Sequence, residues 1–217
     1  MGIRNLLKVP DVTRALLLDM DGVIIDSLAL DLSLVPQMIQ LKWPDRGRDL
    51  LDASIRRHFP EPLPEFWRSI AVDLDLGISE EELVALIESH DEARALQRFD
   101  LCPGVEEIIR EGSKAGLWIA VVSNNQVSDI RSILEPTGLM NLVDALIGLE
   151  QSGGVPKPEP DIYLEAVKAA SLSAHECVAV EDSVIGASAA KAAGCWVVGV
   201  ATGSSSFEEL SSSGMTD

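Results

Sequence analysis

Five short apolar runs constrain the fold of this 217-residue chain more than any other feature. Each run is continuous and does not alternate with polar residues, which is typical of strands covered on both faces of a parallel sheet. The runs are ALLL (15–18), LWIAVV (117–122), ALIGL (145–149), VAV (178–180) and CWVVGV (195–200). Helical stretches separate the later runs. This alternation predicts an α/β fold with a doubly wound parallel sheet.

The helical stretches carry the signals expected of helices that pack on such a sheet. GVEEIIREGSKAG places Val105, Ile108 and Ile109 on one face and is expected to end at Gly116. QVSDIRSILEPTG is expected to stop at Pro136 and Gly138. EPDIYLEAVKAAS and SVIGASAAKAAG are the other two helices that we expect.

About a hundred residues separate the first two runs, and residues 28–98 read as helix without a matching strand. One helix there is expected to begin with a capping box formed by Ser79 and Glu82. We therefore expect two domains, an α/β core of residues 1–27 and 99–217 and a helical insert of residues 28–98. The serine-rich end, GSSSFEELSSSGMTD, is expected to fray.

Polar residues follow four of the five runs at the points where the strands are expected to end. They are Asp19 and Asp21 after the first run, Ser123 and Asn124 after the second, Lys157 after the third, and Glu181 and Asp182 after the fourth. The fifth run ends in ATGSS, which offers no comparable charged group. Ligands of open parallel sheets bind beyond the carboxyl ends of the strands, so this edge is the predicted site.

The acids among these residues predict a metal ion. If Asp19, Asp21, Glu181 and Asp182 share one crevice, their like charges oppose ionisation. A bound cation relieves that repulsion, and ligands that are all oxygens favour a hard ion such as Mg²⁺.

The remaining residues predict an anion site beside the acids. Lys157 adds a positive charge between Pro156 and Pro158, Ser123 adds a hydroxyl, and Asn124 adds a backbone N–H. A phosphate held there would meet a carboxylate oxygen in line, which suggests covalent catalysis through an aspartyl-phosphate. A second acid could protonate the leaving oxygen and later take a proton from water.

Each motif also has a plainer interpretation. The Asp-Gly pair in LLLDMDGVII is a turn signal that fits a plain hairpin. The motifs that begin at Ser123 and Glu181 could simply cap helices, and Lys157 could be an ordinary loop lysine. Their order at the ends of consecutive elements favours a joint site.

Composition excludes several classes of protein. A net charge of −18 argues against binding to nucleic acid. No apolar run approaches the roughly 20 residues of a membrane helix, and the first residues lack a secretory signal, so we expect a cytoplasmic protein without a membrane partner. The three cysteines, Cys102, Cys177 and Cys195, are widely spaced and are expected to be reduced thiols in the core.

The segments DMDGVIIDS, VVSNN, KPEPD and VAVEDSVIGASAAKAAG resemble the four motifs of the haloacid dehalogenase superfamily. The resemblance covers residues 14–27 and about 100–205. It is greatest to the phosphatase and β-phosphoglucomutase-like branch, which implies a Rossmann-like core with an inserted helical cap domain. The cap would be mobile and would close over the substrate.

The resemblance also implies roles for the acids. Asp19 would be the nucleophile and would bind Mg²⁺. Asp21 would be the general acid and base, and would give the metal its backbone carbonyl. Asp182, together with Glu181, would hold Mg²⁺ directly or through water.

The other motif residues would handle the phosphate. Ser123 and the amide of Asn124 would hold the transferring group, and Lys157 would bridge phosphate and nucleophile. In the first cap loop, KWPDRGRD, Arg46 and Arg48 are candidates for binding a second anionic group of the substrate, and Trp43 for a wall of its pocket. For all three, solvated surface is the plainer interpretation.

These observations predict a Mg²⁺-dependent phosphatase for a small phosphorylated metabolite such as a sugar phosphate, acting as a monomer or weak homodimer. A phosphosugar mutase with the same core is the main alternative. A dehalogenase needs no metal, so the extra acids argue against it, and Lys42 is the only lysine in the cap, which disfavours a phosphonatase. A non-catalytic sensor of phosphorylated metabolites is the remaining alternative, and the full set of acids argues against it.

Overall fold

The computed structural model describes residues 7–45, 48–59 and 61–217. The chain forms two compact units, one made of residues 1–26 and 100–217 and the other of residues 27–99. Within the described ranges, no helix is both long enough and apolar enough to cross a membrane. All three cysteines are buried and free, as expected.

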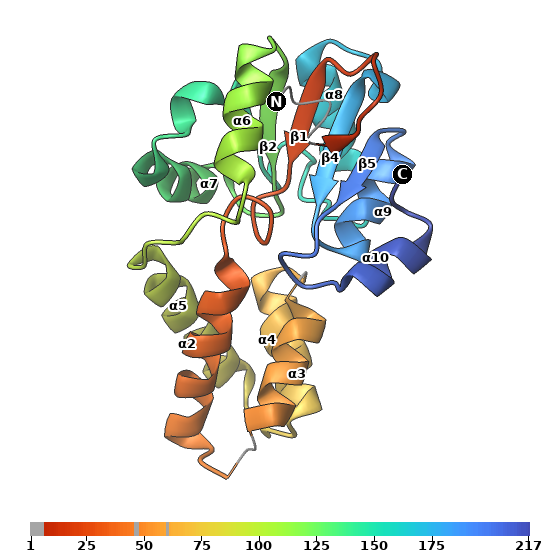
Figure 1. Ribbon diagram of the computed structural model, residues 1–217. Coiled ribbons are helices and arrows are strands. Elements are labelled where there is room, and N and C mark those ends of the chain that lie inside the picture. Colours follow the sequence, from red (N-terminus) through yellow and green to blue (C-terminus); the bar gives the residue numbers. More distant parts are fainter. Residues whose placement is uncertain (1–6, 46–47, 60) are drawn as a thin grey trace. The chain divides into compact units, whose positions relative to one another are not determined.

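The larger unit contains a parallel sheet of five strands in the order β3-β2-β1-β4-β5 (Figure 1). The strands are β1 (Ala15–Leu18), β2 (Trp118–Val122), β3 (Ala145–Ile147), β4 (Cys177–Glu181) and β5 (Trp196–Gly199). The central strand β1 pairs in parallel with β2 and β4, and Leu16 lies opposite Ile119 and Val178. The prediction of a doubly wound parallel sheet is confirmed, and the alternative of a plain hairpin at Asp-Gly is wrong.

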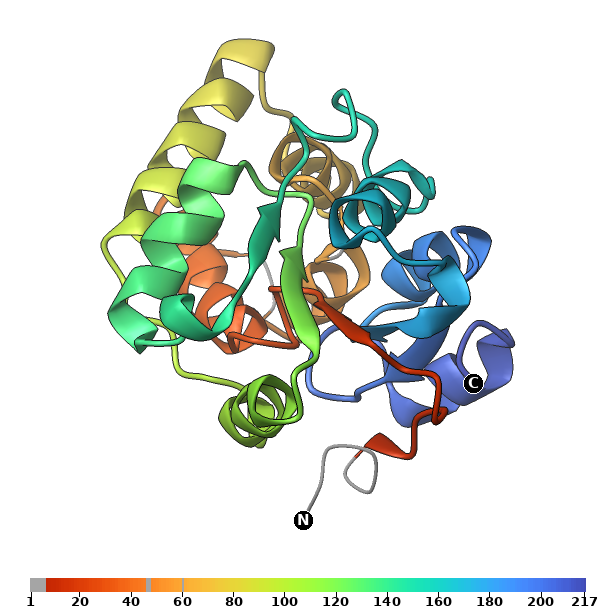
Figure 2. The same cartoon turned by 90° about the horizontal axis from the view of Figure 1, so that it is seen from above.

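Helices cover both faces of this sheet (Figure 2). On one face, α8 (Asp161–Ala170) and α9 (Val184–Ala192) share a core with Leu17. On the other face, Gly112 of α6 (Val105–Lys114) lies so close to Leu16 that an added Cβ would be 2.9 Å from its Cδ1. Successive residues of a strand point to opposite faces, so a continuous apolar strand suits a sheet packed on both sides.

The other helices of the larger unit are short. They are α7 (Val127–Leu134), η1 (Glu135–Thr137), η2 (Met140–Leu142), η3 (Ala174–Glu176) and α10 (Phe207–Ser213). The expectation of a frayed C-terminus is wrong. Ser206 and Glu209 form a capping box, Leu210 is buried, and the backbone N–H of Asp217 donates to the carbonyl of Val197. These contacts fix a segment whose serine content suggests a loop.

The smaller unit contains four helices, α2 (Ser27–Lys42), α3 (Arg48–His58), α4 (Leu63–Asp73) and α5 (Glu80–Ala95). The capping box of Ser79 and Glu82 is present at the start of α5. Inside the unit, the indole of Trp67 donates to Nδ1 of His90 at 3.1 Å, and Nε2 of His90 lies 3.1 Å from Asp31. The indole N–H can only donate, so Nδ1 of His90 accepts. Nε2 of His90 therefore carries the hydrogen and donates a hydrogen bond to Asp31.

Candidate active site

The predicted site residues of the larger unit meet at the carboxyl ends of its strands. Asp19 follows β1 directly, Ser123 follows β2, and Glu181 ends β4. Lys157 comes from the loop between β3 and α8 and reaches the same place. Asp19, Ser123, Lys157, Glu181 and Asp182 are all buried. Parallel strands bring these positions together because all their carboxyl ends lie at one edge.

The ammonium group of Lys157 lies between two carboxylates. Its Nζ donates to Oδ1 of Asp19 at 2.6 Å and to Oε1 of Glu181 at 2.6 Å. A third bond goes to the backbone carbonyl of Val122 at 3.0 Å. Only 5% of the lysine side chain is exposed. The three bonds satisfy every donor of the ammonium, so its position is fixed by contacts from the carboxyl ends of β1, β2 and β4.

Asp19, Glu181 and Asp182 form an acidic cluster. One carboxylate oxygen of each lies within 4.8 Å of the others, close enough for all three to face one metal ion. Oε2 of Glu181 is buried without a hydrogen-bond partner among the described residues. A buried carboxylate oxygen without a partner is costly, and a donor set of oxygens alone suits a hard divalent cation. The residues present therefore fit a divalent metal ion.

Glycines provide the space for two of these carboxylates. A Cβ on Gly186 would lie 2.0 Å from Oε2 of Glu181, and one on Gly203 would lie 1.9 Å from Oδ2 of Asp182. Gly22 has φ near +76°, which favours glycine, and a Cβ there would lie 2.6 Å from Asp182. The Asp-Gly pair after β1 thus makes a tight turn against Asp182, which directly follows β4.

Burial shifts the ionisation of the cluster. It raises the pKa of Asp19 to about 8, with a further contribution from Glu181, and raises the pKa of Asp182 to about 7, with a further contribution from Asp19. Burial also raises the pKa of Glu181. For Lys157, burial alone lowers the pKa, but Asp19 and Glu181 outweigh it and hold the group charged. A metal ion would oppose the shifts of the acids because it stabilises their ionised forms.

Two residues that the sequence did not single out hold the acids in place. The hydroxyl of Tyr163 donates to Glu181, and the ring of Tyr163 lies 5.1 Å from Nζ of Lys157. Ser204 donates from its backbone N–H to Oδ2 of Asp182 at 2.8 Å. Ser204 lies in the segment after β5, where the sequence offered no charged group. In both cases the partner comes from a different element, so no local pattern indicates the contact.

The loop after β2 forms hydrogen bonds with Lys157 and with Asp21. Oδ1 of Asn124 accepts from the backbone N–H of Lys157 at 3.0 Å, and Oγ of Ser123 accepts from the backbone N–H of Asn125 at 3.2 Å. Nδ2 of Asn125 donates to Oδ2 of Asp21 at 2.9 Å. The carboxylate of Asp21 is therefore directed to the β2 loop and is not part of the three-acid cluster. Asn125 is a further contact that the sequence did not indicate.

The three substrate-binding candidates of the cap loop belong to the helical unit. Trp43 is half-buried against the apolar core of its own unit, with Nζ of Lys42 5.0 Å from its ring. Arg46 lies outside the described residues, and Arg48 is described only as the first residue of α3. Their roles toward a substrate remain predictions.

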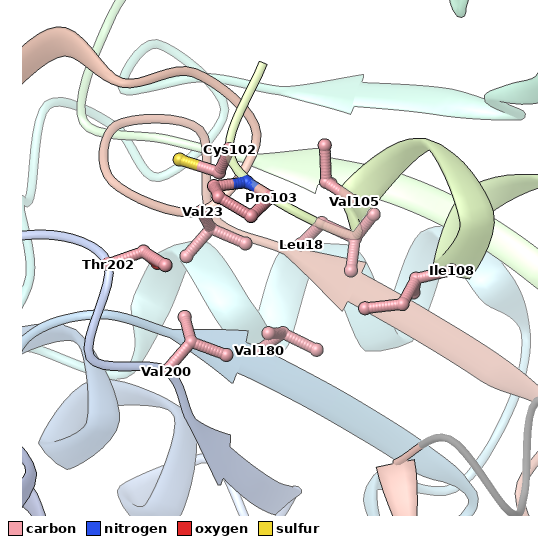
Figure 3. A pocket seen from close by; sticks show the side chains of 9 residues that line it. All are labelled: Leu18, Val23, Cys102, Pro103, Val105, Ile108, Val180, Val200 and Thr202. Carbon is pink, nitrogen blue, oxygen red and sulfur yellow. The ribbon is translucent and has the colours of Figure 1, made fainter.

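A small pocket of about 40 Å³ also lies in the larger unit (Figure 3). Apolar side chains make up most of its lining, which consists of Leu18, Val23, Cys102, Pro103, Val105, Ile108, Val180, Val200 and Thr202. Burial raises the pKa of the Cys102 thiol to about 12, so this cysteine is not poised as a nucleophile. This apolar lining is unsuited to a phosphate.

Comparisons with known proteins identify a family and several relatives. Residues 13–194 match the family model of the haloacid dehalogenase-like hydrolases. Hexitol phosphatase B of Escherichia coli K12 is 28% identical over 202 residues, which cover 86% of this chain and 83% of that protein. β-Phosphoglucomutase of Bacillus subtilis is 29% identical over 115 residues, 48% of this chain and 45% of that protein.

A solved structure supports the fold. The crystal structure of a hydrolase from Deinococcus radiodurans, which contains bound phosphate and sodium, superposes with a TM-score of 0.77. Its sequence identity is 23%, and the match covers 94% of this chain and 90% of that one.

Proposed function

Since the chain belongs to the haloacid dehalogenase-like hydrolase family, we propose that it is a Mg²⁺-dependent phosphatase that hydrolyses a small phosphorylated metabolite. The chain is an enzyme of the family's phosphatase and phosphomutase group. The metal ion, the covalent intermediate and the substrate class are our proposal. The observation that carries it is the ammonium of Lys157, held at 2.6 Å from both Asp19 and Glu181 beside Asp182.

In the first half-reaction, a carboxylate oxygen of Asp19 attacks the phosphorus of the ester. The bond between phosphorus and the ester oxygen breaks, and an aspartyl-phosphate forms. Asp21 donates its proton to the leaving alkoxide, so that a neutral alcohol departs. Lys157 and the Ser123 hydroxyl stabilise the negative charge on the transferring group.

In the second half-reaction, water attacks the phosphorus of the aspartyl-phosphate. Asp21, now a carboxylate, takes the proton of that water, and the bond between phosphorus and Asp19 breaks. Inorganic phosphate leaves, and both acids return to their starting protonation states. Asp21 thus acts first as the acid and then as the base, and it ends the cycle with the proton that it had at the start.

Asp19, Glu181 and Asp182 would hold the Mg²⁺ ion, with the backbone carbonyl of Asp21 as a further ligand. When bound, the ion neutralises charge that Asp19 and the phosphate would otherwise direct at each other. The unpartnered Oε2 of Glu181 supports this assignment, since water or metal in the cluster would satisfy it.

A sugar phosphate or sugar-alcohol phosphate is the substrate class that we favour, and hexitol phosphatase B is the relative that supports it. A net charge of −18 disfavours a polyanionic substrate such as nucleic acid. A phosphosugar mutase is the second candidate, and the match to a β-phosphoglucomutase supports it. In that case the aspartyl-phosphate would pass its phosphoryl group to a sugar hydroxyl instead of to water.

The test is release of inorganic phosphate from about a hundred phosphate esters, with Mg²⁺ and with excess EDTA. We expect release from sugar or sugar-alcohol phosphates that depends on Mg²⁺. Isomerisation of a hexose phosphate that needs a catalytic bisphosphate, with little phosphate release, would favour the mutase. No turnover of any ester, para-nitrophenyl phosphate included, would contradict both candidates.

Binding of Mg²⁺ is expected to be at least roughly tenfold tighter at pH 8 than at pH 6, because protons compete for the same acids. The pKa values of Asp19 and Asp182 are raised to about 8 and about 7. In the metal-free protein, the contribution of these two acids to the free energy of unfolding is largest below their unfolded pKa values. It is lost as pH rises through their folded pKa values. Isothermal titration and thermal unfolding with EDTA or Mg²⁺ measure both effects.

The matched variant for this test is Asp182→Asn, which removes one acid of the cluster. It should bind Mg²⁺ more weakly and show a smaller difference between the two pH values. Equal Mg²⁺ affinity at pH 6 and pH 8 in the unmodified protein would contradict the assignment of the ion to these acids.

A further inference from the structure

Asn125 connects the loop after β2 to the acid that we assign to proton transfer. Its Nδ2 donates to Oδ2 of Asp21 at 2.9 Å across two neighbouring strand ends. Both residues are half-buried. Asp21 lies two positions after Asp19, so its carboxyl group must be directed at the ester oxygen while Asp19 faces the phosphorus. A contact that fixes the direction of Asp21 therefore bears on the reaction itself.

The backbone of Asn125 is held independently of its side chain. Its N–H donates to Oγ of Ser123 at 3.2 Å, and its carbonyl accepts from the N–H of Leu149 at 3.0 Å. A substitution at position 125 can therefore remove the bond to Asp21 while the loop keeps its backbone contacts. The effect of the Asn125 side chain on the reaction can therefore be measured in a variant that still folds.

We propose that Asn125 is a positioning residue that sets the direction of the Asp21 carboxyl group for proton transfer to the leaving oxygen. The proposal rests on the proposed phosphatase function. An amide N–H can donate to a carboxylate oxygen and equally to the carbonyl oxygen of a protonated carboxyl group. The bond therefore persists when Asp21 gives its proton to the alkoxide and when it takes one from water.

A positioning role for Asn125 should affect substrates differently according to their leaving groups. An alkyl phosphate releases a strongly basic alkoxide, so breaking its ester bond needs the proton of Asp21. Para-nitrophenyl phosphate releases a weakly basic phenolate, which departs without much help from an acid. Loss of correct positioning should therefore slow the first ester far more than the second, whereas general damage to the site should slow both alike.

The experiment compares kcat/KM for sorbitol 6-phosphate, glucose 6-phosphate and para-nitrophenyl phosphate, because kcat/KM reports the steps up to formation of the aspartyl-phosphate. For Asn125→Ala we expect a loss of roughly 10- to 100-fold on the alkyl ester that the unmodified enzyme cleaves faster. On para-nitrophenyl phosphate we expect a loss below about threefold. Asn125→Asp keeps the shape but replaces the donor with a second carboxylate, and should lose at least as much on the alkyl ester.

The matched control is Gln126→Ala, which removes a neighbouring amide that is exposed and makes no capping bond to α7. It should leave both rates unchanged, and thermal unfolding should give similar midpoints for all variants. Equal losses on the two kinds of ester, or no loss in Asn125→Asp, would overturn the role of Asn125 while leaving the phosphatase function intact. If the unmodified enzyme cleaves no ester, the phosphatase function fails, and the role of Asn125 fails with it.

Discussion

The variant Asp19→Asn is expected to lose turnover of every phosphate ester by on the order of 10⁴-fold or more. An amide in place of the carboxylate has nearly the same shape but cannot attack phosphorus, so no aspartyl-phosphate can form. Steady-state phosphate release measures the loss. Borohydride reduction of the working enzyme, followed by mass spectrometry, should mark residue 19 only in the unmodified protein.

The fold should survive this substitution. Burial and Glu181 raise the pKa of Asp19 to about 8, so the ionised side chain is disfavoured in the metal-free protein and a neutral amide should not destabilise it above pH 7. The matched control is Asp129→Asn, which changes an exposed acid in the first turn of α7 and should retain turnover. Substantial turnover in Asp19→Asn would remove Asp19 from the role of nucleophile.

The sequence predicted the strands because each apolar run is local, and it predicted the site because polar groups lie at or beyond the ends of these runs. Asp19, Lys157 and Glu181 lie far apart in the chain, yet parallel strands bring their ends to one edge. The capping box at Ser79 was predictable for the same reason, since its two residues are three positions apart. Local patterns of this kind survive tertiary packing.

The contacts that the sequence did not indicate are pairings between separate elements. Tyr163 lies in an apolar helix pattern in which nothing distinguishes a core residue from a partner of Glu181. Ser204 and Asn125 are small polar residues in loops, where a helix cap or a turn is the ordinary interpretation. The C-terminal helix was missed because serine content outweighed one buried leucine, Leu210, and a capping box. The contacts of such residues can be recognised only in the three-dimensional structure, where the ends of the partner strands have known positions.

The variant Lys157→Met should lose activity, and its metal-free form should be less stable than the unmodified protein. Both effects follow from loss of the ammonium group. The ammonium is the shared partner of Asp19 and Glu181, and its removal leaves two buried carboxylates without a cation. Breaking a buried ion pair on one side costs about 3–5 kcal/mol, and losing a preorganised positive charge at the phosphate costs at least ~10²-fold in turnover. Urea unfolding in EDTA and phosphate release measure the two losses.

The dependence on pH distinguishes this explanation from a simple loss of packing. Without Lys157, the pKa values of Asp19 and Glu181 should rise further, and both acids stay neutral in the folded state at low pH. The unfolded chain ionises them near their ordinary values, so stability falls as pH rises, and the deficit of Lys157→Met should be larger at pH 8 than at pH 5. Lys168→Met, which removes an exposed lysine of α8, is the matched control and should change neither quantity. A deficit equal at both pH values would mean that Lys157 acts mainly as a packed side chain.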